Sequence, residues 1–117
     1  MSENLQLASD FLNAWASSQA DRFTSYLDRE VSFESPMATL QGRDAVAAAM
    51  SEFAQAVTGI KVLASAASQD SVLIMYDMHT GPFGTIRAAE HYRFRDGKIV
   101  SDQLVFDASA IKAGPPG

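Results

Sequence analysis

Three polar residues in the second half of the chain are candidates for acid-base chemistry, namely Asp77, His79 and Glu90. Asp77 and His79 stand two residues apart in a strand-like run, so their side chains share one face. If Gly81–Gly84 forms a four-residue loop, antiparallel pairing sets Asp77 opposite Ala88 and brings Glu90 to that same face. A carboxylate beside an imidazole can fix its tautomer for use as a base. In an apolar pocket Glu90 would favour its protonated form, as a general acid requires.

The facing of a fourth candidate, Asp107, depends on the hairpin at Asp96-Gly97. This dipeptide is a strong turn signal, but it is compatible with two registers. A two-residue turn pairs Glu90 with Gln103 and places Asp107 on the same face. A three-residue loop instead pairs Glu90 with Asp102. We favour the two-residue turn.

Each candidate also has a purely structural interpretation. Glu90 could simply pair with Arg87, Arg93 or His79, because a buried carboxylate is costly unless it is paired. His79 could lie exposed at the lip of the hairpin. Asp107 could be a solvated turn residue at the end of a strand.

Helical patterns precede strand patterns along the chain. Apolar residues at three- and four-residue steps predict helices up to residue 18 and over residues 21–27 and 44–57. Alternating patterns predict strands over 31–34, 60–67, 71–80 and 85–105, the last broken by the hairpin at 96–97. Helices followed by an antiparallel meander indicate an α+β fold, with the helices packed on one face of a curved sheet.

Such a fold would leave a pocket for a small apolar organic molecule. Beside the candidate acids and bases, the residues expected to line it are Phe11, Trp15, Ser35, Met75, Tyr92 and Gln103. The opposite face of strand 71–80 carries Val72, Ile74, Tyr76 and Met78. Both faces of the sheet therefore need cover, one from the helices and one from a second copy of the chain, which predicts a homodimer through the outer sheet face.

Composition narrows the class of protein. The 117 residues, 47% of them hydrophobic, suffice for one domain, placed at 1–110 with a flexible tail at 111–117. A net charge of -5 argues against nucleic acid as a partner, and no apolar stretch approaches the roughly 20 residues of a membrane-spanning helix. Without cysteine, and with two histidines expected to face opposite ways, no metal or cofactor is expected. The N-terminus lacks a secretory pattern, so a cytoplasmic location is expected.

Several local segments make the chain similar to a known family: Phe33–Pro36, Gly42–Ala45, Glu90–Ile99 and Phe106-Asp107. Placed after two helices, at the start of the third and in the last strands, they resemble the SnoaL-like branch of the NTF2-like superfamily. That superfamily includes ketosteroid isomerases, polyketide cyclases and limonene epoxide hydrolases. The resemblance covers nearly the whole chain and implies a cone-shaped α+β fold.

The catalytic residues that the resemblance implies are only partly present in this chain. At the positions that match the base, the tyrosine and the aspartic acid of ketosteroid isomerases, this chain has Ser35, Phe11 and Glu90. Two of the three catalytic groups are missing, so that activity is not expected. Asp107 resembles the terminal aspartate of the cyclases, whereas no arginine stands among Met75, Asp77 and His79 to complete the epoxide hydrolase set.

Two classes of function follow from these residues. The first is an enzyme of isomerase, cyclase or hydrolase type that acts by acid-base catalysis on a small apolar molecule, without a cofactor. The second is a non-catalytic module of the same fold that binds a ligand or a partner.

Overall fold

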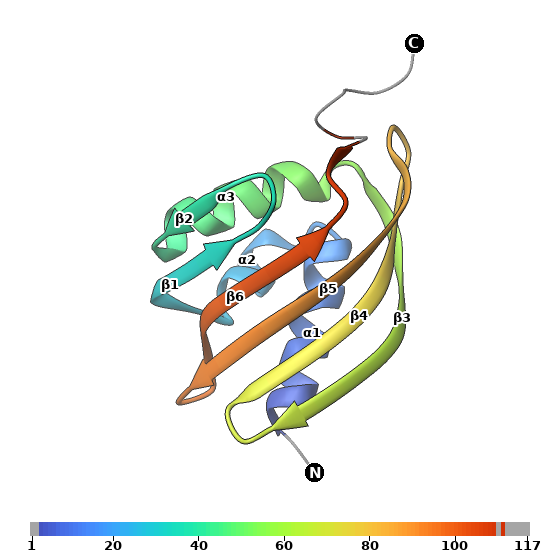
Figure 1. The fold of residues 1–117 in the computed structure, drawn as a ribbon. Helices are drawn as coiled ribbons and strands as arrows, with labels where there is room; N and C mark the ends of the chain where they lie inside the picture. The colour runs from blue at the N-terminus through green and yellow to red at the C-terminus, as the bar shows by residue number, and fades with distance from the viewer. Residues whose placement is uncertain (1–2, 110, 112–117) are drawn as a thin grey trace.

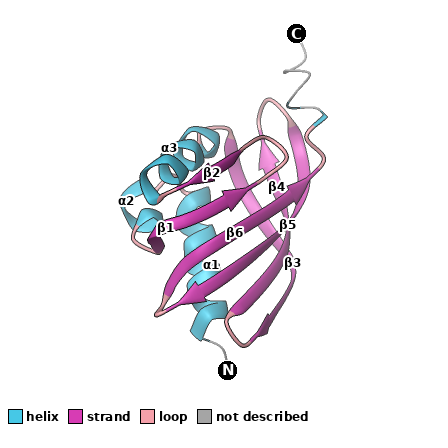
Figure 2. Ribbon diagram, turned by 60° about the vertical axis from the view of Figure 1, so that its left-hand side comes forward, coloured by secondary structure: helices cyan, strands magenta, loops and turns pink. Residues whose placement is uncertain are grey.

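The computed structural model describes residues 3–109 and residue 111. Three helices, α1 (Glu3–Ala16), α2 (Ala20–Thr24) and α3 (Arg43–Ala54), pack on one side of a curved sheet (Figures 1 and 2). The strands are β1 (Leu27–Glu34), β2 (Thr39–Gln41), β3 (Val57–Ser68), β4 (Ser71–Thr80), β5 (Gly84–Arg95) and β6 (Lys98–Phe106). They form one sheet in the order β2-β1-β6-β5-β4-β3. The predicted α+β class is therefore confirmed.

The helices cover the sheet with the apolar stripes that their sequences predict. In α1 the side chains of Phe11, Leu12 and Trp15 are almost completely buried, at the three- and four-residue spacing of one helical face. In α3 the buried positions include Val46 and Met50, four residues apart. The side of the sheet that meets these stripes is the inner face.

The four long strands β3 to β6 form the predicted antiparallel meander. β1 begins earlier than expected, at Leu27, and lies parallel to β6. The short strand β2 at Thr39–Gln41 was not predicted, since three residues give no clear period. It pairs antiparallel with β1 and lies at the edge of the sheet.

The hairpin between β4 and β5 has a three-residue loop, so the predicted four-residue loop is wrong. Thr80 pairs with Gly84, whose positive φ of 71° is readily available to glycine. The Thr80 hydroxyl donates to the Gly84 carbonyl at 2.7 Å and accepts from the Phe83 amide at 3.0 Å. Every pairing beyond the loop therefore moves by one residue, so that Asp77 pairs with Arg87 and Ile74 with Glu90.

The hairpin between β5 and β6 has the favoured two-residue turn at Asp96-Gly97, with Arg95 paired to Lys98. Both turn residues have positive φ, 52° and 75°, as a type I′ turn requires. A bulge at Val100 then shifts the register, so that Tyr92 pairs with Asp102 and Glu90 with Leu104. The expected pairing of Glu90 with Gln103 is therefore wrong, although the turn itself is right.

These two register changes decide which side chains face the helices. Val72, Ile74, Tyr76 and Met78 are at most 1% exposed and lie on the inner face, not the outer one. The large apolar residues of the outer face are Leu73, Met75 and Val105. Ile111, assigned in advance to the tail, is half-buried against the core, and residues 112–117 of that tail lie outside the described residues. No helix in the described part of the chain is long and apolar enough to cross a membrane.

Candidate functional site

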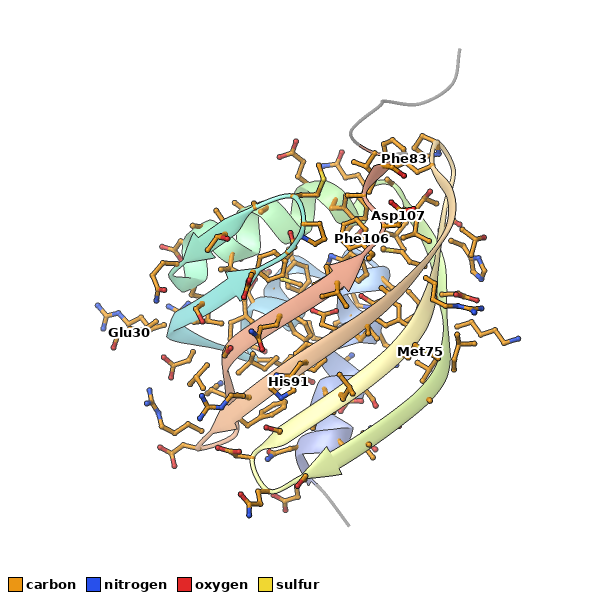
Figure 3. All side chains as sticks on the ribbon, in the orientation of Figure 1. Glu30, Met75, Phe83, His91, Phe106 and Asp107 are labelled. Atoms are coloured by element: carbon orange, nitrogen blue, oxygen red, sulfur yellow. The ribbon has the colours of Figure 1, made fainter. Side chains whose placement is uncertain are left out.

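A cavity of about 420 Å³ lies between the inner face of the sheet and the helices. Its walls are mostly apolar and come from distant parts of the chain, including Trp15 of α1, Phe53 of α3 and Leu104 of β6. Phe83 and Phe106 line it at the end of the molecule where the β4–β5 hairpin and the end of β6 lie (Figure 3). Such a space fits a small, mostly apolar molecule.

Glu90 contributes a buried carboxylate to this cavity. Its side chain projects from the middle of β5 to the inner face and is only 2% exposed. The Tyr76 hydroxyl, on the neighbouring strand β4, donates a hydrogen bond to Glu90 Oε1 at 2.8 Å. Because Tyr76 is 1% exposed, this bond lies in surroundings of low polarity, where hydrogen bonds are strong and unpaired polar groups are costly.

A second buried carboxyl, that of Asp102, lies behind Glu90. Asp102 of β6 and Tyr92 of β5 are paired across the two strands, and both are 0% exposed. No hydrogen bond of good geometry reaches the Tyr92 hydroxyl or either Asp102 oxygen within the described residues, although both side chains lie close to Glu90. Two carboxyl groups and two phenols therefore share one buried cluster, made of Tyr76, Glu90, Tyr92 and Asp102.

Burial controls the protonation of this cluster. It raises the pKa of Asp102 well above its ordinary value, and the negative charge of Glu90 adds to the effect. Burial, followed by the charge of Glu90, likewise raises the pKa of Tyr76 and the pKa of Tyr92. Both phenols therefore stay neutral and can donate a proton to a hydrogen bond, and Asp102 holds its proton to higher pH than an ordinary aspartic acid does.

The structure places three of the predicted site residues at the cavity: Glu90, Trp15 and Ser35. Phe11 and Tyr92 are buried deeper, where their rings meet edge to face with centroids 5.7 Å apart. They support the cavity from behind and are not among its lining residues.

Asp77, His79 and Met75 lie on the outer face, away from Glu90, so the prediction that they share its face is wrong. Asp77 accepts hydrogen bonds from Arg87 at 2.9 and 3.1 Å, and hydrogen bonding by Arg87 lowers the pKa of Asp77. His79 is exposed, with Nδ1 at 3.1 Å from the Thr85 hydroxyl. The reason is the three-residue loop, because a slip of one residue turns every side chain of a strand to the other face.

Asp107 and Gln103 also lie away from the cavity. The prediction that they share a face with Glu90 is therefore wrong. Asp107 is exposed beyond the end of β6 and accepts a hydrogen bond from the Ser109 amide at 3.0 Å, which lowers the pKa of Asp107 (Figure 3). Gln103 is exposed on the outer face, where it contacts His91 and Glu34. Gln103 faces outward because the bulge in β6 shifts the register by one residue, so that Glu90 pairs with Leu104.

Two members of the cluster, Tyr76 and Asp102, were not among the predicted site residues. On sequence grounds Asp102 pairs with Glu90 only if the Asp96-Gly97 hairpin has a three-residue loop, whereas we favour the two-residue turn. Tyr76 could have been found from the composition of β4, since its neighbours at two-residue steps, Ile74 and Met78, are apolar, whereas the alternate positions carry Asp77 and a histidine. The more apolar of two strand faces is the one that is buried.

The cluster does not resemble a metal site. Within the part of the chain that the structure describes, no three His, Asp or Glu side chains gather closely enough to hold a metal ion. Carboxyl and phenol groups such as those of Glu90 and its neighbours can take part in proton transfer and hydrogen bonding.

A model of the SnoaL-like domain matches residues 8–102, so the chain belongs to the SnoaL-like family. No curated protein matches the chain. The resemblance inferred from the sequence is thus confirmed.

Solved structures show the same fold. A protein from Kribbella flavida DSM 17836 is 28% identical, with a TM-score of 0.89 over 93% of this chain and 90% of that one. An NTF2-like protein of unknown function from Cytophaga hutchinsonii ATCC 33406 is 19% identical, with a TM-score of 0.81 and 96% of each chain covered. An LEH-like epoxide hydrolase from M. tuberculosis is 19% identical, with a TM-score of 0.79 over 97% of this chain and 89% of that one. The last two likenesses confirm the NTF2-like fold and carry no information on activity.

Proposed function

We propose that the protein is an enzyme that uses Glu90 as a general acid-base group on a small, mostly apolar organic molecule bound in the cavity. One observation carries the proposal: a carboxylate is buried in an apolar cavity, bonded to Tyr76 and backed by a second carboxyl, Asp102. Burial of two neighbouring carboxyl groups destabilises a protein unless it is compensated, and such arrangements are frequent at sites of proton transfer.

The arrangement supports a division of roles between the two carboxyl groups. Asp102 holds a proton because its pKa is raised, while the Tyr76 hydroxyl stabilises the Glu90 carboxylate through Oε1. The Glu90 carboxylate can then take a proton from a bound molecule and return it at another atom. Isomerisation, cyclisation and hydrolysis all need such a proton transfer. An LEH-like epoxide hydrolase of this fold makes the hydrolase type one of the reactions to test.

The alternative is a ligand-binding module without turnover. This alternative is favoured because most polar groups of the cavity are already hydrogen-bonded within the protein. The indole Nε1 of Trp15 already donates to the Met50 carbonyl at 2.9 Å, and the Ser35 hydroxyl accepts from the Met37 and Ala38 amides. A transition-state oxyanion would thus find few side-chain donors there.

Turnover of a panel of enones, epoxides and polyketide-like ketones by Glu90→Gln separates the two functions. The amide keeps the size of the side chain and its acceptor for Tyr76, but it cannot transfer a proton. We expect the rate with an active substrate to fall by roughly 10²- to 10⁴-fold. Asp77→Asn is the matched control, because it makes the same chemical change on the outer face. Equal rates for Glu90→Gln and the parent protein, or no turnover of any member, would favour the binding module.

We also propose a homodimer formed through the outer face of the sheet. Met75, Ala89 and Val105 are paired side by side across β4, β5 and β6, with Met75 and Val105 39% and 61% exposed. A row of apolar side chains on an open sheet face supports contact with a second copy. Sedimentation of the parent protein and of Val105→Asp tests this, with a monomeric parent counting against it. The cytoplasmic location stays a prediction.

A further inference from the structure

Strand β3 forms one edge of the sheet, and its second half is open to solvent (Figure 1). At its start β3 is covered, since Val57 is 9% exposed. From Ala64 to Asp70 every residue is exposed, including those that face the helix side of the sheet. Within the described chain β3 pairs with β4 alone, so its other side has no partner strand. The backbone amide and carbonyl groups on that side can therefore accept a further strand.

The two halves of β3 differ in the features that keep an edge strand from pairing with another chain. The first half carries Lys61 and two register shifts, one between Val57 and Gly59 and one between Val62 and Ala64. Charged side chains and bulges both discourage such pairing. Residues 64–68, which we call the open edge, pair with β4 without a shift and consist only of alanine and serine. None of these protective features lies within the open edge.

The small side chains of the open edge distinguish between two kinds of partner strand. A peptide from another protein gains specificity when its alternate side chains enter pockets beside the edge. Alanine and serine are too small to form such pockets. A second copy of the open edge needs none, because two strands of alanine and serine bring together no like charges and no bulky groups. The composition therefore favours a second copy of this chain.

The charges at the two ends of the open edge suit an antiparallel pair of copies. Ala66 is its middle residue, so a two-fold axis at Ala66 pairs the whole open edge with its copy. That axis also lies near the midpoint between Lys61 and Asp70 along the chain. Each lysine is thus brought near the aspartate of the other copy, and opposite charges attract across a strand pair. Asp70 is accessible for this contact, because its ion pair with Arg93 is long, 3.8 Å, and more than half exposed.

We infer that two copies of the chain associate edge to edge, antiparallel about Ala66, so that their sheets join through the two β3 strands. The opposite edge of the sheet is β2, which has three residues and is too short to continue the assembly, so the pairing closes at two copies. This contact is separate from the proposed outer-face dimer and does not depend on the proposed function. A strand edge offers a small area, so we expect weak association, with a Kd on the order of 0.1 mM.

Disulfide formation can locate the pairing, because the chain has no cysteine of its own. Residues directly opposite each other in an antiparallel pair have Cα atoms about 4.5–5.5 Å apart, a distance that a disulfide can bridge. Ala66→Cys should therefore form a disulfide-linked dimer under mild oxidation. Ala64→Cys and Ser68→Cys are the matched controls, because each residue lies about 13 Å from its own copy in this register. Neither should cross-link alone, whereas an equimolar mixture of the two should.

Sedimentation equilibrium measures the same association without a thiol. Ala67 pairs with the buried Val72 and so lies on the helix side of the sheet, away from the outer face. Ala67→Lys brings two lysines together across the axis and should weaken association roughly 10-fold or more. Ala45→Lys, the same change at an exposed position of α3, is the control and should stay within about twofold of the parent. Both changes are made in Val105→Asp, which removes the outer-face contact from the comparison.

Three results would overturn the inference. The first is a Val105→Asp protein that stays monomeric up to about 1 mM, ten times the expected Kd. The second is Ala66→Cys that cross-links no faster than Ala64→Cys alone. The third is equal association of the proteins with Ala67→Lys and Ala45→Lys. All substituted positions of the open edge are exposed, so the variants should keep the fold.

Discussion

Strand β4 carries polar side chains on both of its faces, and their surroundings differ. Tyr76 points to the inner face, is 1% exposed and bonds to the carboxylate of Glu90. Its neighbour Asp77 points to the outer face, where it pairs with Arg87, whose side chain is 66% exposed. On the inner face a carboxyl group has its pKa raised by burial, as in Asp102, while on the outer face hydrogen bonds to Arg87 lower the pKa of Asp77.

The face of the sheet on which an acidic residue lies therefore sets its chemistry. An ion pair at the surface is screened by water and contributes little to stability. A carboxyl without a charged partner in the interior destabilises its ionised form and so becomes available for proton transfer. Adjacent residues of one strand can therefore differ completely in function.

Replacing Asp102 is expected to give the largest effect on stability. The folded pKa of Asp102 is raised above the ordinary value of 3.8, so the native state holds a proton that the unfolded chain has released. The free energy of unfolding should therefore fall as the pH rises above that value, by about 1.4 kcal/mol per pH unit until the raised pKa is passed. Asp102→Asn lacks this dependence and should gain stability relative to the parent between acid and neutral pH.

Urea denaturation of both proteins over this pH range measures the difference. A constant gap between the two curves would mean that Asp102 titrates alike in the folded and unfolded states, which would contradict the buried environment described for it.

The two tyrosines of the cluster should respond in opposite ways to loss of the hydroxyl. Tyr76→Phe removes the hydrogen bond from the Tyr76 hydroxyl to Glu90 Oε1, and should destabilise the fold by about 1 to 3 kcal/mol. Tyr92→Phe removes a buried hydroxyl that has no partner there, so it should be neutral or stabilising. Equal losses in the two variants, measured by thermal or chemical denaturation, would contradict the hydrogen-bond pattern.

The smallest effects are expected on the outer face. Asp77→Asn and His79→Ala change groups that were candidates for catalysis on sequence grounds, but their side chains do not line the cavity. Turnover and ligand binding should stay within about twofold of the parent protein, as is usual for surface positions. A loss comparable to that of Glu90→Gln would place the chemistry on the outer face.

The sequence allowed the architecture to be predicted, because helical and strand periods are strong and local. The stripe of Phe11 and Trp15, the turn at Asp96-Gly97 and the meander of long strands are all found in the structure. Glu90 was also placed correctly in an apolar pocket.

The rest of the site could not be predicted, because its geometry depends on single-residue shifts in register. Loops of three and four residues between Thr80 and Thr85 are both compatible with the Gly-Pro-Phe-Gly sequence, and they place Asp77 on opposite faces. The bulge at Val100 has no marker such as glycine, yet it alone brings Asp102 and not Gln103 to the inner face. The length of the β4–β5 loop and the bulge in β6 are both set by the packing of the whole sheet.

The central claim, that Asp102 is part of a buried acidic cluster while Asp77 is not, can be measured without a substrate. A pH titration followed by ¹³C NMR of the aspartate side-chain carboxyl carbons reports both residues in one sample. We expect Asp77 to titrate below the ordinary range of aspartate and Asp102 to titrate well above it. Overlapping titrations of the two carbons in the ordinary range would contradict this claim.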